Sequence, residues 1–275
     1  YLAKFVNGRL RRVRLPEGNH AQALCDGPHG AYLVATTDHP NTVRVFNNTR
    51  SGWTQLAERT LELPTSLTSV PFAGVAPDGT IWLAVEIVHE DGSGNRVRGA
   101  AVIDPSNDVV VYHHRGADRE AGGLPLPDEI SAIEFDTENA WFASLSGLVR
   151  VGSSQAVVFG EARGVRGEVV SDVVVGSDVI WLAAAEGLGS YDRTTFDFIG
   201  QPALVHEARP QRLAMDLAGN LWLASNRGLI LHEGAEWVVL DADSGLPTTT
   251  LIDVEVDGSG SVWVLADDRV MLLER

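Results

Sequence analysis

A pattern of short strands repeats six times along the 275 residues, and no other feature of the sequence constrains the fold as strongly. Each copy holds an apolar strand, a turn of Gly, Asp or Asn, and then a strand of aromatic, apolar and Ala residues. The copies cover residues 77–84, 136–144, 176–183, 217–225 and 257–266, with an eroded first copy at 27–35. The first copy carries Tyr32 where the others carry Trp.

The spacing of these aromatic residues gives the size of the repeating unit. Successive positions differ by 50, 59, 40, 41 and 41 residues for Tyr32, Trp82, Trp141, Trp181, Trp222 and Trp263. Units of about 40 residues with four short strands are typical of β-propeller blades. We therefore predict an all-β chain, a six-bladed β-propeller of four-stranded antiparallel blades forming a single domain over residues 1–275. The expected blades cover approximately 18–60, 66–115, 128–160, 168–200, 210–243 and 250–275, the last completed by residues 8–16.

The unit around Trp222 shows how strands A to D are placed within a blade. We expect them at residues 212–216, 221–225, 228–232 and 237–241. The apolar runs have five to seven residues, are rich in Val and Ile and end at Gly, which favours strands and leaves no convincing amphipathic helix.

The last unit has only three expected strands, at 251–257, 261–266 and 269–273. Residues 9–15 form a strand pattern with no partner ahead of the first blade. We therefore expect this N-terminal strand to complete the last blade and close the ring, which removes two exposed sheet edges.

The charge of the chain limits its partners. The sequence has 21 Lys and Arg against 37 Asp and Glu, a formal net charge of −16. Nucleic acids and anionic membrane surfaces both attract basic proteins, so we expect no nucleic-acid partner and no docking on such a membrane. No apolar run approaches the roughly 20 residues that span a bilayer, so we expect no membrane insertion.

The cysteine content and the start of the chain bear on its compartment. Cys25 is the single cysteine, so no intrachain disulfide can form, and we expect it to be a small buried hydrophobe rather than a nucleophile. The sequence begins at Tyr1 rather than Met, which leaves the compartment open. A periplasmic or extracellular location is favoured over a cytoplasmic one.

Two units carry a family resemblance. Residues 220–229 and 180–192 resemble the two-component-regulator propeller repeat, and the stretch 243–247 is similar to the linker between such repeats. The resemblance covers about 130–275 well and 1–129 loosely, and the same strand occurs in streptogramin-lyase-like and NHL-type propellers. It implies a propeller fold and an extracytoplasmic sensor that binds a ligand, often a glycan. The chain departs from the regulators in having one six-unit ring and no visible kinase.

One face of the predicted ring carries the candidate binding residues. In a propeller the B–C and D–A connections share a face, and the long insertions 86–98 and 115–129 are one connection of each kind. The alternative is length drift at a tolerant surface. The candidate residues on this face are His39, Glu86, Asn95, Glu129, Glu186, Asn226, Arg227 and Asp267.

Polar residues also begin several A strands near the expected central channel. Asp172, Arg212 and Asp253 are the clearest, and such groups can hydrogen-bond a polar ligand such as a sugar. A solvent-filled channel with no ligand is the competing interpretation. The repeated Trp residues are expected to pack between blades rather than stack on a ligand. The turns Asp78-Gly79 and Asp257-Gly258 fit hairpin chemistry better than calcium binding.

Catalytic signatures are mostly missing, so the first hypothesis is a non-enzymatic module without a cofactor. It would bind a small polar ligand, a glycan or another protein, as a sensor or regulatory domain. The alternative is a metal-dependent lactonase or lyase, with a divalent cation such as calcium in the central channel. Its ligands would be Glu129, Asp172, Asn226 and Asp253. A third possibility is a structural or interaction domain of a larger protein.

The closure hypothesis predicts the effect of a truncation. Deletion of residues 1–15 is expected to lower the melting temperature of the whole domain, because the last blade would lose its fourth strand. Thermal unfolding followed by circular dichroism measures this. A melting temperature equal to that of the full chain would contradict the closure.

Overall fold

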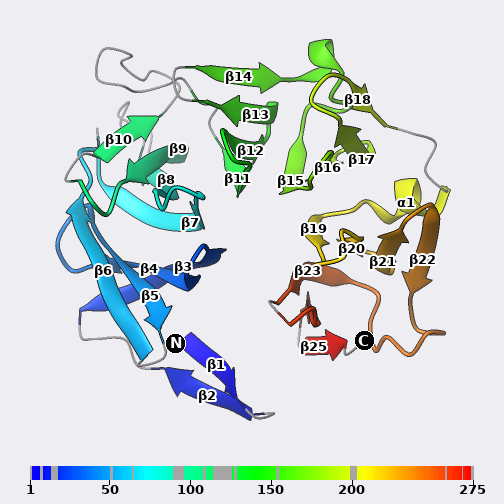
Figure 1. Cartoon of the computed structure of the whole chain (residues 1–275), viewed down its shortest axis with the longest axis horizontal. Helices are drawn as coiled ribbons and strands as arrows, with labels where there is room; N and C mark the ends of the chain where they lie inside the picture. Colours follow the sequence, from blue (N-terminus) through cyan, green and yellow to red (C-terminus); the bar gives the residue numbers. More distant parts are fainter. Residues whose placement is uncertain are drawn as a thin grey trace. The chain divides into compact units, whose positions relative to one another are not determined.

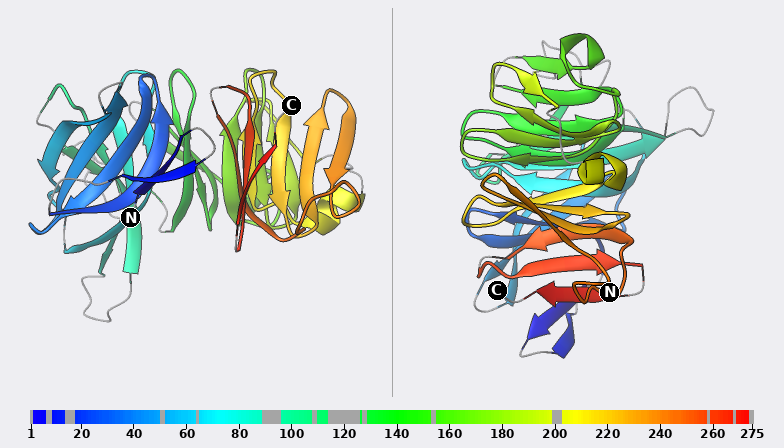
Figure 2. Two further views of the ribbon diagram at one scale, coloured as in Figure 1. Left: turned by 90° about the horizontal axis from the view of Figure 1, so that it is seen from below. Right: turned by 90° about the vertical axis from the view of Figure 1, so that its right-hand side faces the viewer.

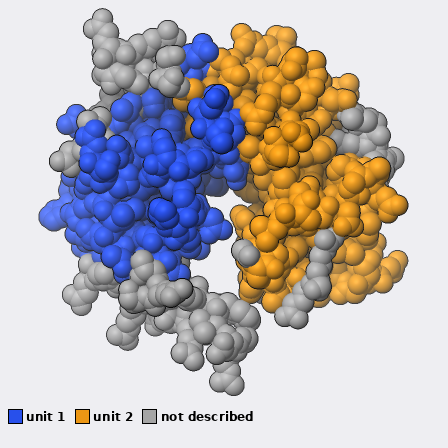
Figure 3. Space-filling model, in the orientation of Figure 1, with its two compact units in different colours: residues 1–139, 153–156 blue, residues 140–152, 157–275 orange. Residues whose placement is uncertain are grey.

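The computed structural model describes residues 2–6, 9–13, 18–49, 52–63, 65–88, 96–107, 110–113, 126, 129–152, 155–198, 203–257, 259–267 and 269–273. The chain divides into two compact units, one of residues 1–139 and 153–156 and the other of residues 140–152 and 157–275 (Figure 3). We refer to them as unit 1 and unit 2, and we describe each by itself.

Antiparallel strands dominate the chain (Figure 1). Five sheets have four strands, in the orders β3-β4-β5-β6, β10-β9-β8-β7, β11-β12-β13-β14, β15-β16-β17-β18 and β19-β20-β21-β22. A sixth sheet has three described strands, β23-β24-β25. These sheets correspond in number and order to the six predicted blades, and the all-β propeller class is confirmed.

The first strands belong to unit 1. Their bounds are β1 Leu2–Val6, β2 Arg9–Val13, β3 Asn19–Gly27, β4 Gly30–Thr37, β5 Thr42–Thr49, β6 Gly52–Thr60, β7 Leu67–Val75, β8 Ile81–Val88, β9 Arg96–Ile103, β10 Val110–His113 and β11 Ile130–Phe135. The third and fourth sheets continue with β12 Ala140–Ser144, β13 Gly147–Val151, β14 Ala156–Phe159, β15 Val170–Val175, β16 Ile180–Ala184, β17 Gly187–Tyr191 and β18 Phe196–Asp197. The last two sheets contain β19 Arg212–Met215, β20 Leu221–Ser225, β21 Gly228–Glu233, β22 Glu236–Leu240, β23 Leu251–Val256, β24 Val262–Ala266 and β25 Val270–Leu273.

The predicted strand positions are confirmed where they were given in detail. Around Trp222 the four observed strands begin and end within one residue of the expected bounds. The three expected strands of the last unit correspond to β23, β24 and β25. Figure 2 shows these short strands running beside one another in each twisted sheet.

The sheets of unit 2 bury apolar side chains on both faces. In β20, Leu221 and Leu223 join the core shared with the sheet of β15–β18, through Ala183 and Leu188. The alternate residue Trp222 joins the core shared with the sheet of β23–β25. Because successive side chains of a strand point to opposite faces, one apolar run serves two cores.

Glycine shapes the turns between the first strands of several sheets. The loops 77–79, 217–219 and 259–260 each end in a glycine with positive φ, Gly79, Gly219 and Gly260, which donates its N–H back across the turn. Positive φ costs a residue with a Cβ atom but not glycine, which explains the Gly in these copies of the repeat.

Two of these turns each contain an aspartate that accepts hydrogen bonds from the turn backbone and from the indole N–H of the repeated tryptophan. Asp216 accepts N–H groups of its own turn, and its Oδ2 accepts the indole N–H of Trp222 at 3.2 Å. Asp257 does the same for Trp263 at 2.8 Å. Hydrogen bonds from Ser259 and Trp263 lower the pKa of Asp257 to about 2. The turn aspartates are therefore structural, as the hairpin interpretation predicted.

The repeated aromatic residues pack within the protein. Tyr32, Trp141 and Trp222 are buried, and Trp82 stacks on His113 with centroids 5.4 Å apart. Trp181 meets the edge of His232 at 5.5 Å. The prediction that these residues pack rather than stand open is confirmed for the described copies.

The expectation that the chain holds no convincing helix is wrong at two short segments. A 3-10 turn covers Glu161–Arg163 and α1 covers Ala203–Ala208. Val205 and Ala208, three residues apart, are buried against β17 and its neighbours. A helix of six residues is too short to show a repeating apolar pattern in the sequence, which is why it was missed.

The N-terminal strand has a partner that the sequence did not indicate. In the described residues β2 pairs with β1, Leu2 opposite Val13, in a sheet of two strands. Closure of the ring by residues 9–15 is not shown, and residues 14–15 lie outside the described part. The closure and the single-domain organisation therefore stay predictions. No described helix is long and apolar enough to cross a membrane.

Two glycines of the sheet of β19–β22, one in the A–B turn and one at the end of the B–C turn, predict an asymmetric response to substitution. Gly228 has φ of +119°, and a Cβ atom there would collide with the backbone carbonyl of Leu240. Gly219 also has positive φ, +85°, but nothing lies within 4 Å of its Cβ position. We expect G219A to cost about 1 kcal/mol of unfolding free energy, from backbone strain alone. G228A should cost at least twice that amount, since it adds a collision with backbone.

Urea unfolding of both variants beside the wild-type protein measures the two costs. G219A is the matched control, because it makes the same chemical change at the same sign of φ. Equal losses for the two variants would show that the strands around Gly228 separate without cost, contrary to the expectation.

Candidate functional site

The structure divides the candidate residues between the two units. His39, Glu86 and Glu129 belong to unit 1. Glu186, Asn226, Arg227 and Asp267, with Asp172, Arg212 and Asp253, belong to unit 2. Asn95 and most of the two long insertions lie outside the described residues, so their expected role at a binding face stays a prediction.

The unit 1 candidates differ in their surroundings. His39 is exposed in the turn between β4 and β5, and Glu129 is exposed at φ of +68° just before β11. Glu86 is buried in β8, where the hydroxyl of Thr68 donates to its main-chain oxygen at 2.9 Å.

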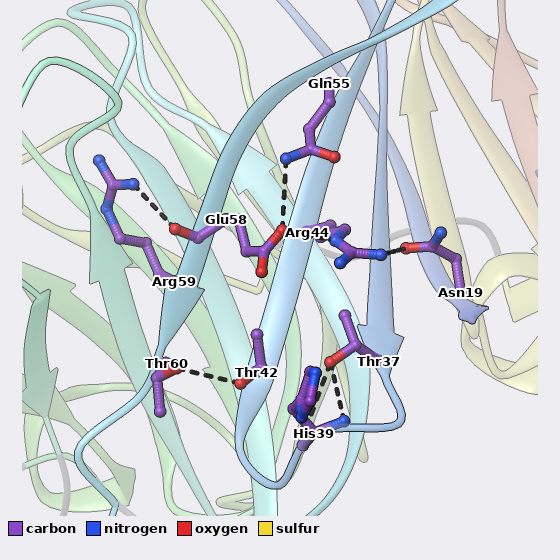
Figure 4. A network of polar contacts seen from close by, with 9 residues as sticks. All are labelled: Asn19, Thr37, His39, Thr42, Arg44, Gln55, Glu58, Arg59 and Thr60. Carbon is purple, nitrogen blue, oxygen red and sulfur yellow. Dashed lines mark hydrogen bonds and ion pairs between the residues drawn. The ribbon is translucent and has the colours of Figure 1, made fainter. Parts of the chain in front are cut away.

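Polar contacts tie the sheet of β3–β6 together around His39 (Figure 4). Thr37 Oγ1 accepts the backbone N–H of His39 at 3.1 Å. Arg44 Nε donates to Glu58 Oε2 at 2.6 Å, and Arg44 Nη1 donates to Asn19 Oδ1 at 3.2 Å. The hydrogen bond from Arg44 lowers the pKa of Glu58. Arg44 therefore has its charge matched by a carboxylate of its own sheet.

In unit 2 three of the candidate residues occupy two-residue turns between the second and third strands of a sheet. We call these turns, residues 185–186 and 226–227, the rim turns. Glu186 lies in the turn between β16 and β17, and Asn226 and Arg227 form the turn between β20 and β21. All three are exposed, as is Asp267 after β24.

A buried serine at the end of the second strand supports the turn at 226–227 and the corresponding turn after β12. Ser225 Oγ donates to Gly228 O at 2.7 Å and accepts the N–H of Arg227 at 3.1 Å. Ser144 holds the turn after β12 in the same way, with 2.8 Å to Gly147 O. The sequence reasoning missed these two serines, although the recurrence of Ser three residues after Trp141 and Trp222 was a usable signal.

The connections between sheets lie against the same turns. Ala185 N–H donates to Val169 O at 2.9 Å, and Asn226 N–H donates to Ala208 O at 3.3 Å. Arg227 forms an ion pair with Glu207 of α1 at 2.9 Å. In unit 2 the B–C turns and D–A connections therefore share one end of the sheets, as the sequence reasoning expected.

Asp172, Arg212 and Asp253 occupy equivalent positions in three successive sheets. Their cross-strand partners are Ala183, Ala224 and Leu265, each two residues after the repeated tryptophan. All three lie within the first three residues of the first strand of a sheet, and β19 contacts both β15 and β23. The result is an acidic–basic–acidic row at the end of the sheets that also carries the rim turns.

Asp172 is buried and connects two sheets. Its Oδ1 accepts the N–H of Val173 at 2.9 Å, and its Oδ2 accepts the N–H of Leu213 in β19 at 2.7 Å. Burial raises the pKa of this carboxyl to about 7, against the opposing effects of the Leu213 hydrogen bond and the Arg212 charge. Gln22 makes a comparable contact in unit 1, where its Oε1 accepts the N–H of Val70 at 3.2 Å.

Arg212 and Asp253 are less enclosed than Asp172. Arg212 Nη1 donates to the carbonyls of Ser171 at 3.1 Å and Gln211 at 2.9 Å. Asp253 Oδ1 accepts the N–H of Val254 at 3.0 Å. Burial raises the pKa of Asp253, while the positive charge of Arg212 opposes that rise. A guanidinium thus lies within electrostatic reach of both carboxyl groups.

The predicted metal ligands do not gather in the described residues. No group of three or more His, Cys, Asp or Glu in the described ranges has the arrangement of a metal site. Asp172 already uses both oxygens for backbone N–H groups. Cys25 is half-buried rather than fully buried, and it packs against the core of unit 1. Burial, followed by the nearby charges of Asp26 and Glu134, raises the pKa of its thiol to about 12, which disfavours the reactive thiolate.

Comparisons with known proteins bear on the fold. No protein-family model and no curated protein matches the sequence. The extracellular domain assigned to the hybrid two component system BT3049 of B. thetaiotaomicron is 17% identical with a TM-score of 0.56, covering 94% of this chain and 39% of that one. That assigned to the one component system BT4673 of the same organism is 15% identical with a TM-score of 0.50, covering 97% and 43%. A streptogramin B lyase is 12% identical with a TM-score of 0.50, covering 95% of both chains.

Identities this low show a shared fold and nothing finer. The matches support the β-propeller class and include two of the three propeller groups that the repeat resembles, the two-component regulators and the streptogramin lyases. The chain spans well under half the length of the two extracellular domains.

The buried carboxyl of Asp172 predicts a pH-dependent stability. Its folded pKa lies above that of an unfolded Asp, so its contribution to stability is full at low pH and declines as the pH rises through about 7. Between pH 5.5 and 8.5 the wild-type protein should lose about 2 kcal/mol relative to D172N, whose side chain stays neutral.

Urea unfolding at the two pH values measures this difference, with D243N at an exposed position as the control. D243N should follow the wild-type protein at both values. If D172N and wild type change in parallel with pH, the carboxyl of Asp172 does not titrate in this window.

Proposed function

We propose that the chain is a non-enzymatic β-propeller module that binds a small polar ligand, a glycan or another protein. The observation that supports this most directly is the row of Asp172, Arg212 and Asp253 beside the rim turns of unit 2. Ligand sites combine a few placed polar groups with a rigid support, and these groups start strands of well-packed sheets.

Hydrogen bonds hold the backbone of the turn at 226–227 in one conformation, which favours a binding role over length drift at a tolerant surface. Ser225 and Gly228 fix the backbone of the turn at 226–227, so its side chains project from a backbone of defined conformation. The turn also contacts the connection through α1. Such rigid loops are suited to recognition because little ordering entropy is lost on binding.

We further propose a sensor or regulatory role outside the cytoplasm. The repeat resembles that of two-component regulators, and extracellular domains assigned to such systems are among the structural neighbours.

A metal-dependent lyase or lactonase is the weaker alternative. Asp172 already uses both carboxylate oxygens for backbone N–H groups, which leaves fewer free ligands for a metal ion. The cation Arg212 contributes charge beside both aspartates, where a bound metal ion would be repelled.

A thermal-shift screen with neutral and acidic oligosaccharides and with peptides tests the binding function. At least one class should raise the melting temperature, because a ligand that binds only the folded state stabilises it. D253N should reduce that rise, while D178N, at the opposite end of the sheet of β15–β18, should not. No stabilisation by any class would count against the module, and a rise caused by calcium alone would favour the metal alternative.

A further inference from the structure

We infer that Arg212 recognises a carboxylate group of the ligand, and that Asp253 accepts a hydrogen bond from a neighbouring ligand hydroxyl or amine. This inference rests on the proposed binding function and adds the chemical class of the ligand. It follows from how the polar atoms of these two side chains are used.

Arg212 has donors left over. Only Nη1 is engaged, with the carbonyls of Ser171 and Gln211, and no carboxylate among the described residues lies within ion-pair distance. Nε and Nη2 have no partner in the described part of the chain, and neither is among its buried atoms that lack one, so both are open to solvent. The N–H groups of Nε and Nη2 lie on the same side of the guanidinium group, within its plane. They can therefore donate together to the two oxygens of one carboxylate.

Two other described arginines are paired with carboxylates. Arg44 donates to Glu58 at 2.6 Å, and Arg227 pairs with Glu207 at 2.9 Å. Arg212 is half-buried and is held in place by two backbone carbonyls, yet its charge has no contacting carboxylate in the described residues. A guanidinium that is held in this way and keeps two donors on one side is suited to bind a carboxylate.

Asp253 supplies an acceptor next to it. Its Oδ1 accepts the N–H of Val254, whereas Oδ2 has no partner among the described residues and is likewise open to solvent. β23 contacts β19, and the Arg212 charge acts on the carboxyl of Asp253. A donor group of the ligand placed beside its carboxylate could therefore reach Asp253.

The neighbouring charges select the kind of anion. Asp172 and Asp253 flank Arg212 at the equivalent positions of the adjacent sheets. A dianionic phosphate would be repelled by the Asp253 carboxylate more strongly than a carboxylate ligand, which carries a single charge. A sugar acid combines this carboxylate with hydroxyl donors on the same ring, which matches the free donors of Arg212 beside the open Oδ2 of Asp253.

Isothermal titration of the full chain with paired probes tests the inference. The acidic probes are oligosaccharides of galacturonate and glucuronate, and the neutral probes are their methyl esters, which keep the sugar ring and hide the carboxylate. An acidic probe should bind at least about tenfold more tightly than its ester, as expected for a charged hydrogen-bonded pair.

R212Q and R150Q each remove one positive charge, so comparing them separates recognition by Arg212 from the effect of net charge on binding. R212Q should abolish the preference for the acid over the ester, and R212K should restore only part of it, because Lys lacks the planar fork. R150Q removes the same charge from β13, where the guanidinium lies 5.8 Å from the ring centroid of Phe159, and should keep the preference.

The outcomes distinguish this inference from the proposed function. Tight binding of esters or neutral glycans that R212Q leaves unchanged would overturn the role of Arg212 while supporting the binding module. Loss of the preference in R150Q as well would also overturn it, since net charge alone would then explain the result. Binding of no acidic probe, while peptides or neutral glycans stabilise the protein, would overturn the inference alone.

Discussion

The sheet of β19–β22 depends on its neighbours in unit 2 because it is apolar on both faces. β20 shows this most directly, since Leu221 and Leu223 enter one core while Trp222 enters the next. A sheet with two apolar faces cannot be stable alone in water, whereas a row of such sheets buries each face against the next. The repeat of about 40 residues follows from this burial, because every repeating unit must present two apolar faces to its neighbours.

Much of the fold could be predicted because its signals are local. Gly219 and Gly260 end turns that need positive φ, and the repeated Trp marks the second strand of the unit. The α1 helix could not be predicted, because its six residues bury only Val205 and Ala208 and carry no longer pattern. The pairing of β1 with β2 was also missed, since two strands of five residues have no signal of their own in a chain already full of strands.

The candidate site was predicted in part. The sequence placed Asp172, Arg212 and Asp253 near the starts of first strands, and they lie in β15, β19 and β23, while their role at a site stays a prediction. It could not show that Asp172 accepts the N–H of Leu213, because that contact joins residues 41 positions apart. One aspartate of the row is thus structural and buried, while the other keeps an open oxygen, a difference set by packing rather than by residue type.

The serine beneath two of the B–C turns separates the support of a turn from the residues at its tip. Ser144 and Ser225 hold the turn backbone through hydroxyl groups that are fully buried, and glycine supplies the conformation that follows. The side chains at the two tip positions are exposed and lie outside the cores of the sheets. Each of these turns therefore offers a pair of positions at which side chains can be exchanged at little cost in stability. The groups exposed at this end of the sheets can thus change one blade at a time, while the same scaffold continues to fold.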